Sequence, residues 1–300
     1  MNSHKPSVVF FGNERLATGV TTKAPVLRAL IDAGYPIEAV VVNHDQATSR
    51  KQRVLEVEEL AKEHNIPVLL EFSPSLTSPV AVLAAYGKIV PKSVIDHFEY
   101  GIVNIHPSAL PKYRGSTPIE SVILDGSTST AVSLMKLDVK MDAGGVYAQN
   151  EVVLRSTTSK QDLADELGKL GADMLIKALS QILVSSLDAQ PQEESQATFT
   201  RQITKQDGQI DWNKSAQEIE REIRAYAGWP GSSTEINDKP ITITQAEIIE
   251  ETGEPGKAFV HNKQLAIYCG QDALLITNLK PAGKRQMSSR DFLAGNPISS

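Results

Sequence analysis

The feature that most constrains the fold is the alternation of short apolar runs with helical segments in the first third of the chain. Four runs, at residues 7–12, 37–42, 66–70 and 80–85, have the length and apolar character of buried strands in a parallel sheet. Residues 25–34 and 55–64 are helical segments between them, the first with Pro25 near its start and Gly34 at its end. Strands and helices in this order form β-α-β units, so we predict an α/β fold with a doubly wound, mostly parallel, Rossmann-like sheet.

A fifth strand is predicted at the start of the stretch from Gly101 to Pro118, where a β-branched, alternating run is broken by Pro107. Because side chains alternate along a strand, Asn104 and His106 share one face of it. Ligands of open α/β sheets bind at the carboxyl ends of strands, so this polar pair marks a candidate site. A buried, hydrogen-bonded polar pair in the core is an equally good interpretation of these residues alone.

The second half of the chain changes character after a long helix predicted over residues 159–184. Residues 187–204 are rich in Gln, Glu, Ser and Ala, which is typical of a linker on the surface. Short extended runs separated by turn residues follow one amphipathic helix at 215–226, as in a small β-barrel. We therefore predict a first domain over residues 1–186, a linker over 187–204, and a small OB-like β-barrel domain over 205–300.

Composition narrows the class of protein. The chain has 300 residues, a formal net charge of −6 and 41% hydrophobic residues, as expected of a globular protein rather than a polycation. The single Cys269 forms no intrachain disulfide, and no Cys/His spacing fits zinc, so we expect a metal-free protein of a reducing compartment. The sequence has no stretch long and apolar enough for a membrane span, and we expect a cytoplasmic monomer without membrane contact.

Two further groups of residues have a structural and a functional interpretation. Arg50, Lys51 and Arg53 lie close together before a predicted helix, either as a solvated loop or as an anion-binding one. Asp142 lies beside two glycines and is an ordinary turn former unless the fold brings it to His106.

The sequence around these residues resembles the folate-dependent formyltransferase family. The motif Asn-Ile-His-Pro-Ser-Ala-Leu-Pro-Lys-Tyr-Arg-Gly at 104–115 carries the resemblance, together with Ala85-Tyr-Gly87 and Met141-Asp-Ala-Gly144. The C-terminal motifs are similar to those of members that formylate methionyl-tRNA, and they occur at residues 210–212, 223–230 and 280–293. The resemblance covers nearly the whole chain.

The resemblance implies transfer of the formyl group of 10-formyltetrahydrofolate to the α-amine of methionine on initiator tRNA in translation initiation. It implies catalytic roles for Asn104, His106 and Asp142, and no metal. It implies folate contacts from Tyr86, Gly87 and the loop Ser108-Ala109-Leu110-Pro111, in which Ala109 replaces the family's usual leucine. Arg50, Lys51 and Arg53, with Lys284 and Arg285 of the second domain, are the residues we expect to contact tRNA phosphates.

Other functions remain open at this point. Formyl transfer to a nucleotide-sugar amine, or hydrolysis of 10-formyltetrahydrofolate, needs the same first domain. A non-catalytic RNA-binding or folate-binding protein is an alternative from another class, although a complete set of Asn, His and Asp argues against it.

Overall fold

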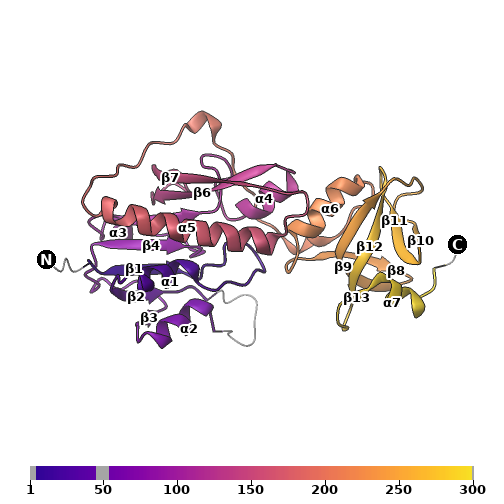
Figure 1. The fold of residues 1–300 in the computed structure, drawn as a ribbon, viewed down its shortest axis with the longest axis horizontal. Helices are drawn as coiled ribbons and strands as arrows, with labels where there is room; N and C mark the ends of the chain where they lie inside the picture. Colours follow the sequence, from indigo (N-terminus) through magenta and orange to yellow (C-terminus); the bar gives the residue numbers. More distant parts are fainter. Residues whose placement is uncertain (1–4, 45–53, 299–300) are drawn as a thin grey trace. The chain divides into compact units, whose positions relative to one another are not determined.

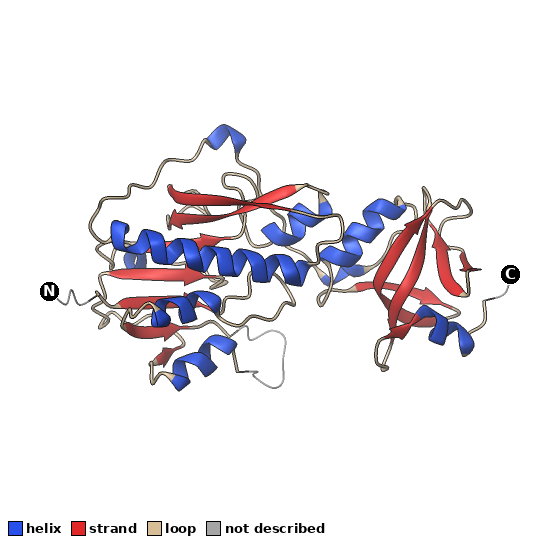
Figure 2. Ribbon diagram, in the orientation of Figure 1, coloured by secondary structure: helices blue, strands red, loops and turns tan. Residues whose placement is uncertain are grey.

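The computed structural model describes residues 5–44 and 54–298, and the chain divides into two compact units. The N-terminal unit contains Met1–Ile119, Thr128–Arg155 and Gln161–Arg201; the C-terminal unit contains Glu120–Ser127, Ser156–Lys160 and Gln202–Ser300. The strands and helices of both are drawn in Figures 1 and 2.

The N-terminal unit is built on a seven-stranded sheet of order β3-β2-β1-β4-β5-β6-β7. The first five strands are parallel, whereas β6 is antiparallel to β5 and β7 is antiparallel to β6. The strands are β1 (Val8–Gly12), β2 (Ile37–Val41), β3 (Val68–Leu69), β4 (Val80–Ala84), β5 (Ile102–His106), β6 (Ser129–Lys136) and β7 (Val146–Val153). The mostly parallel α/β sheet predicted from the sequence is confirmed.

Helices cover both faces of this sheet. They are α1 (Pro25–Asp32), α2 (Glu56–Glu63), α3 (Lys92–Ile95) and α5 (Lys160–Ile182), whereas α4 (Pro118–Leu124) belongs mostly to the C-terminal unit. On one face α5 packs so closely that a Cβ on Gly171 would lie 2.7 Å from a methyl carbon of Ile105. On the other face, α3 contributes to a core cluster that contains Ile102. Since Ile102 alternates with Ile105 along β5, Asn104 and His106 lie on the face opposite α5.

The C-terminal unit is an antiparallel sheet of order β10-β11-β12-β9-β8, with β13 paired to β12. Its elements are α6 (Ala216–Ala225), β8 (Ser232–Ile236), β9 (Lys239–Ile249), β10 (Ala258–His261), β11 (Gln264–Tyr268), β12 (Ala273–Pro281), β13 (Met287–Ser288) and α7 (Ser289–Ala294). Ile219 and Ile223 of α6 are buried in one apolar cluster with residues of the strands. The pairings found among the described residues join neighbouring strands and do not close β8 onto β10.

Residues 187–201, within the segment that the sequence suggested as a linker, form specific contacts inside the N-terminal unit. Gln190 pairs with Val146 at the start of β7 through two main-chain hydrogen bonds of 2.8 and 2.9 Å. Phe199 forms a parallel bridge with Arg114. This segment therefore lies against the loops that carry the candidate site.

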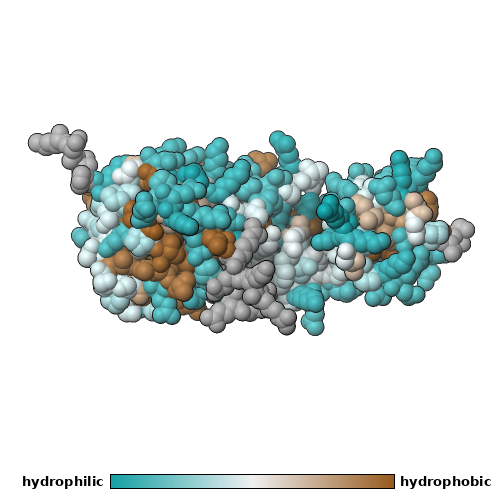
Figure 3. All heavy atoms as spheres, turned by 90° about the horizontal axis from the view of Figure 1, so that it is seen from below, coloured by the Kyte–Doolittle hydropathy of each residue, from teal (hydrophilic) through white to brown (hydrophobic). Residues whose placement is uncertain are grey.

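The surface is mainly hydrophilic in the view of Figure 3, and its largest apolar area lies on the N-terminal unit. Exposed large apolar side chains of this unit include Val68, Leu70 and Ile89. Over the residues described, no helix has the length and hydropathy of a membrane span.

Candidate active site

Asn104 and His106 occupy the carboxyl end of β5, inside the sheet rather than at its edge. Asn104 pairs with Leu83 of β4 and with Met135 of β6, and His106 pairs with Ser133. Both residues are only 5% exposed. Within the described part of the chain, no side-chain hydrogen bond involves Asn104. The strand thus presents an amide and an imidazole side by side.

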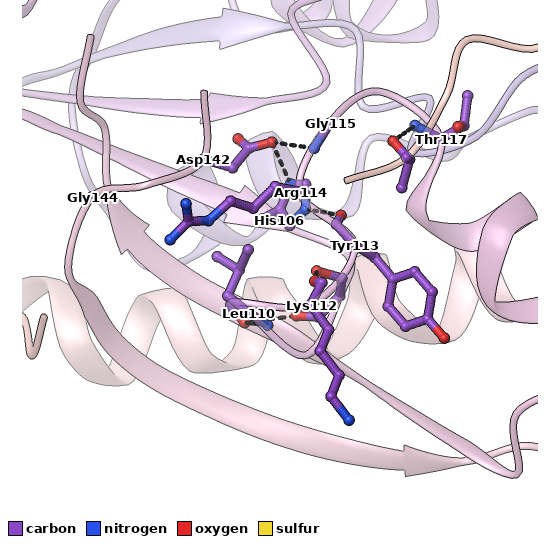
Figure 4. A network of polar contacts seen from close by, with 12 residues as sticks. His106, Leu110, Lys112, Tyr113, Arg114, Gly115, Thr117, Asp142 and Gly144 are labelled. Carbon is purple, nitrogen blue, oxygen red and sulfur yellow. Dashed lines mark hydrogen bonds and ion pairs between the residues drawn. The ribbon is translucent and has the colours of Figure 1, made fainter. Parts of the chain in front are cut away.

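The structure brings Asp142 to His106, as Figure 4 shows. Oδ2 of Asp142 lies 3.7 Å from Nδ1 of His106, and the two side chains are 14% and 6% exposed. On the other side of the ring, Nε2 of His106 lies 3.1 Å from the main-chain oxygen of Tyr113. Because a carbonyl oxygen only accepts hydrogen bonds, we assign the hydrogen of a neutral imidazole to Nε2. Nδ1 is then the basic nitrogen, and it faces a carboxylate.

Asp142 is held from the neighbouring loop and by its own turn. The main-chain N–H of Gly115 donates to Oδ2 of Asp142 at 2.7 Å. The turn lies close to β6, since a Cβ on Gly144 would lie 1.8 Å from the main-chain oxygen of Lys136. Only glycine fits at that approach, which explains the glycines beside Asp142.

The loop Ser108-Ala109-Leu110-Pro111 is fixed by polar contacts beneath it. Ser108 is buried, and its hydroxyl donates to the main-chain oxygen of Lys112 at 2.7 Å. Ser133 of β6 donates to the main-chain oxygen of Ser108 at 2.7 Å, and Gln149 of β7 donates to that of Leu110 at 3.1 Å. Leu110 is buried, whereas Ala109 and Pro111 are half-buried. The backbone of this loop is therefore positioned by residues of two strands.

Tyr86 and Gly87 follow β4 and are placed differently from each other. The ring of Tyr86 packs edge-on against Phe11 at 5.4 Å inside an apolar cluster, and burial raises the pKa of its hydroxyl. Gly87 is exposed and has a φ of 73°. At this position the ring thus belongs to the core, and the main chain of Gly87 faces outward.

The residues expected to contact tRNA are described only in part. Lys284 and Arg285 are exposed in the turn between β12 and β13 of the C-terminal unit. Arg50, Lys51 and Arg53 lie outside the described residues. Across the ranges 5–44 and 54–298, no group of three or more His, Cys, Asp or Glu side chains could hold a metal ion.

The sequence does not single out Arg114 or Gln192, although Gln192 bonds the Asp142 turn and Arg114 bonds Gln192. Arg114 is 1% exposed, and Gln192 lies between it and the main chain of Asp142 and Gly144. An arginine between Pro111 and Gly115 indicates a side chain with a fixed partner, but no local sequence pattern identifies that partner as Gln192.

Comparisons with known proteins agree with this architecture. Residues 20–179 match the formyl transferase domain, and residues 202–297 match the formyl transferase C-terminal domain. A methionyl-tRNA formyltransferase of Coxiella burnetii is 34% identical, over 95% of this chain and 94% of its own. One of Chloroflexus aurantiacus is 38% identical, over 90% of this chain and 92% of its own.

A solved structure extends the comparison to the fold. It is an N-formyltransferase from Helicobacter canadensis in complex with folinic acid and dTDP-3-aminofucose, with a TM-score of 0.69 and 19% identity. The match covers 91% of this chain and 99% of that one. Since both halves match formyl transferase domains and the sequence relatives match over most of their length, this chain belongs to the formyl transferase family.

Proposed function

We propose that this protein transfers the formyl group of 10-formyltetrahydrofolate to the α-amine of methionyl-tRNA, in translation initiation in the cytoplasm. The observation that carries the proposal is the approach of Asp142 to within 3.7 Å of His106 at the end of the strand that bears Asn104. The choice of acceptor is supported by the two relatives at 34% and 38% identity, which are named methionyl-tRNA formyltransferases and match both domains.

The residues of the site suit this chemistry. When an amine attacks a formyl carbon, negative charge develops on the formyl oxygen and the nitrogen must lose a proton. The amide of Asn104 donates a hydrogen bond to that oxygen, which stabilises the charge. His106 takes up the proton at Nδ1, where Asp142 stabilises the resulting imidazolium. When the bond between the formyl carbon and N10 of the folate breaks, the imidazolium gives this proton to N10, and tetrahydrofolate leaves. These groups supply the donor, the base and the counter-charge, so the proposed mechanism uses no metal.

The folate would lie against the loop Ser108-Ala109-Leu110-Pro111 and the main chain of Gly87. The fit is supported by a loop whose carbonyl groups are already bonded from below by Ser133 and Gln149, which leaves the half-buried Ala109 and Pro111 on its accessible side. Ala109 is smaller than leucine, so this part of the site is wider by about the volume of the missing isopropyl group. Tyr86 would act through packing, because its ring lies in the core.

The tRNA would be held by cations, as phosphate recognition requires. Lys284 and Arg285 are exposed in one turn of the C-terminal unit and are the described residues that we assign to this role. Arg50, Lys51 and Arg53 are assigned the same role from the sequence alone.

One experiment separates this function from its alternatives. The purified protein is given 10-formyltetrahydrofolate with methionyl-tRNA, with a nucleotide-linked sugar amine, or with water alone, and released tetrahydrofolate is measured. We expect turnover with methionyl-tRNA, and His106→Asn to abolish it while the protein stays folded. Turnover with the sugar amine alone, or equal release in all three reactions, would refute the proposal.

A further inference from the structure

Gln192 connects a buried arginine to the turn that carries Asp142. Its Nε2 donates to the main-chain oxygens of Asp142 and Gly144, at 2.7 Å each. Its Oε1 accepts from Nε and Nη2 of Arg114, at 3.1 and 3.0 Å. Because an arginine only donates and a carbonyl oxygen only accepts, a single orientation of the Gln192 amide satisfies all four contacts. The side chain is therefore fixed at both ends.

Arg114 is itself held on several sides. It is 1% exposed, and its guanidinium also contacts both carboxylate oxygens of Glu194, at 3.0 and 2.9 Å. Its main chain bonds to Thr198 and Thr200 through N···O distances of 2.9 and 2.8 Å. The residue after it is Gly115, whose N–H bonds the Asp142 carboxylate. One short loop thus orients the carboxylate directly, and reaches the main chain of Asp142 through Gln192.

The backbone of Asp142 needs such support. Its φ is 48°, in the left-handed region, which is unfavourable for a residue other than glycine. A conformation of this kind persists only where the surroundings hold it. The two hydrogen bonds from Gln192 fall on the main-chain oxygens of Asp142 and Gly144, the residues on either side of Ala143, so they restrain this turn.

We propose that Gln192 is a positioning residue, which holds the Asp142 turn so that the carboxylate faces Nδ1 of His106, and that Arg114 fixes the orientation of Gln192. The effect of this arrangement on turnover rests on the proposed formyl transfer, whereas its effect on His106 does not. Gln192 acts on the reaction only through Asp142, since none of its contacts reaches His106 or Asn104.

Gln192→Glu is the discriminating variant, because it keeps the size of the side chain and can still pair with Arg114. It has no N–H to donate, and it turns a carboxylate oxygen toward two carbonyl oxygens. If Gln192 served only to pair with Arg114, glutamate would restore function; if it holds the turn by donation, glutamate fails. Gln192→Ala removes both contacts. Gln190→Ala is the matched control: Gln190 is an exposed glutamine two residues away, and among the described residues its side chain bonds only Asp188.

We expect Gln192→Glu and Gln192→Ala to lower kcat for methionyl-tRNA formylation by about 10- to 100-fold, as for a misplacement of roughly 1 Å at a reacting group, with little change in KM. Gln190→Ala should match the wild type. In a double variant with Asp142→Asn, the Gln192 substitution should lower kcat little further, because both substitutions act on the pair of Asp142 and His106. A wild-type kcat in Gln192→Glu overturns the proposal.

A second measurement decides the proposal without reference to turnover. The imidazole resonances of His106, assigned with His106→Asn, are recorded by NMR across pH in each folded variant. We expect both Gln192 variants to shift them in the direction that Asp142→Asn does, and Gln190→Ala to leave them in place. Resonances unchanged in both Gln192 variants overturn the positioning role. If the wild type formylates none of the acceptors, the proposed function fails and these resonances still test Gln192.

Discussion

Replacing Asp142 with asparagine removes one negative charge beside His106 and changes little else. The amide oxygen of asparagine can still accept the hydrogen bond from Gly115, so the turn should keep its anchor. The two reacting side chains are separated by 3.7 Å between Nδ1 and Oδ2 and are 6% and 14% exposed. At that distance Coulomb's law gives about 4 kcal/mol between a carboxylate and a protonated imidazole, for an effective dielectric constant of about 20.

We therefore expect Asp142→Asn to lose about a thousandfold in the rate of formyl transfer, since each 1.4 kcal/mol or so of barrier is a factor of ten. The loss arises because His106 carries a proton in the transition state and the neutral amide no longer compensates its charge. Single-turnover formylation of methionyl-tRNA at saturating folate measures this step apart from product release.

Asp138→Asn is the matched control, because it makes the same chemical change on an exposed side chain of the same turn. Within residues 5–44 and 54–298 its carboxylate accepts only from the N–H of Lys140, a bond that asparagine retains. Surface changes of this kind usually alter stability by no more than about 0.5 kcal/mol. An Asp142→Asn protein that is folded and formylates within tenfold of the wild type would refute the assignment of the counter-charge.

Further predictions concern stability and tRNA binding. Burial raises the pKa of the Glu14 carboxyl to about 7 from 4.5. Between these pH values the folded state keeps a proton on Glu14 that the unfolded state has released. The contribution of Glu14 to the free energy of unfolding is therefore fully present below pH 4.5 and is lost as the pH rises to about 7, a decrease of about 3 kcal/mol. Glu14→Gln should remove this pH dependence from denaturant unfolding curves. Neutralising Lys284 and Arg285 should weaken tRNA binding and reduce its salt slope by about 1 for each phosphate that the protein no longer neutralises, and an unchanged slope would contradict the assignment. Gly171→Ala should destabilise the N-terminal unit by about 1–3 kcal/mol, because its Cβ would lie 2.7 Å from Ile105; an unchanged melting temperature would show that α5 can shift.

The sequence predicts most of the first sheet because burial dictates its pattern. Every residue of β1, β4 and β5 is buried, and such strands are apolar runs. By contrast, β7 was not predicted: it is an edge strand of largely exposed residues, Val-Tyr-Ala-Gln-Asn-Glu-Val-Val, without an apolar alternation. The helix α3 has only four residues, too few for a helical period to be recognised.

The residues of the candidate site also include some that the sequence predicts and some that it does not. Asn104 and His106 are neighbours on one strand, so strand geometry predicts that they lie together. The approach of Asp142 was expected only from the family resemblance, because it depends on how β6 and its turn pack against β5. The placement of Arg114 and Gln192 follows from no local pattern, since residues 78 positions apart meet through the path of residues 187–201.

The contacts of residues 187–201 affect where the first domain ends. A protein cut after residue 186, the boundary suggested by composition, would lose the pairing of Gln190 with Val146, the bridge between Phe199 and Arg114, and both bonds from Gln192 to the Asp142 turn. The strand pattern of the sheet would be complete in such a protein, but the Asp142 turn would lose the restraint from Gln192 and keep the bond from Gly115 to its carboxylate. The carboxylate can stabilise a charge on His106 only when it lies beside it. We therefore propose that the catalytic unit ends functionally after Arg201, the last residue of the segment that contacts the loops of the site, and not at the end of α5.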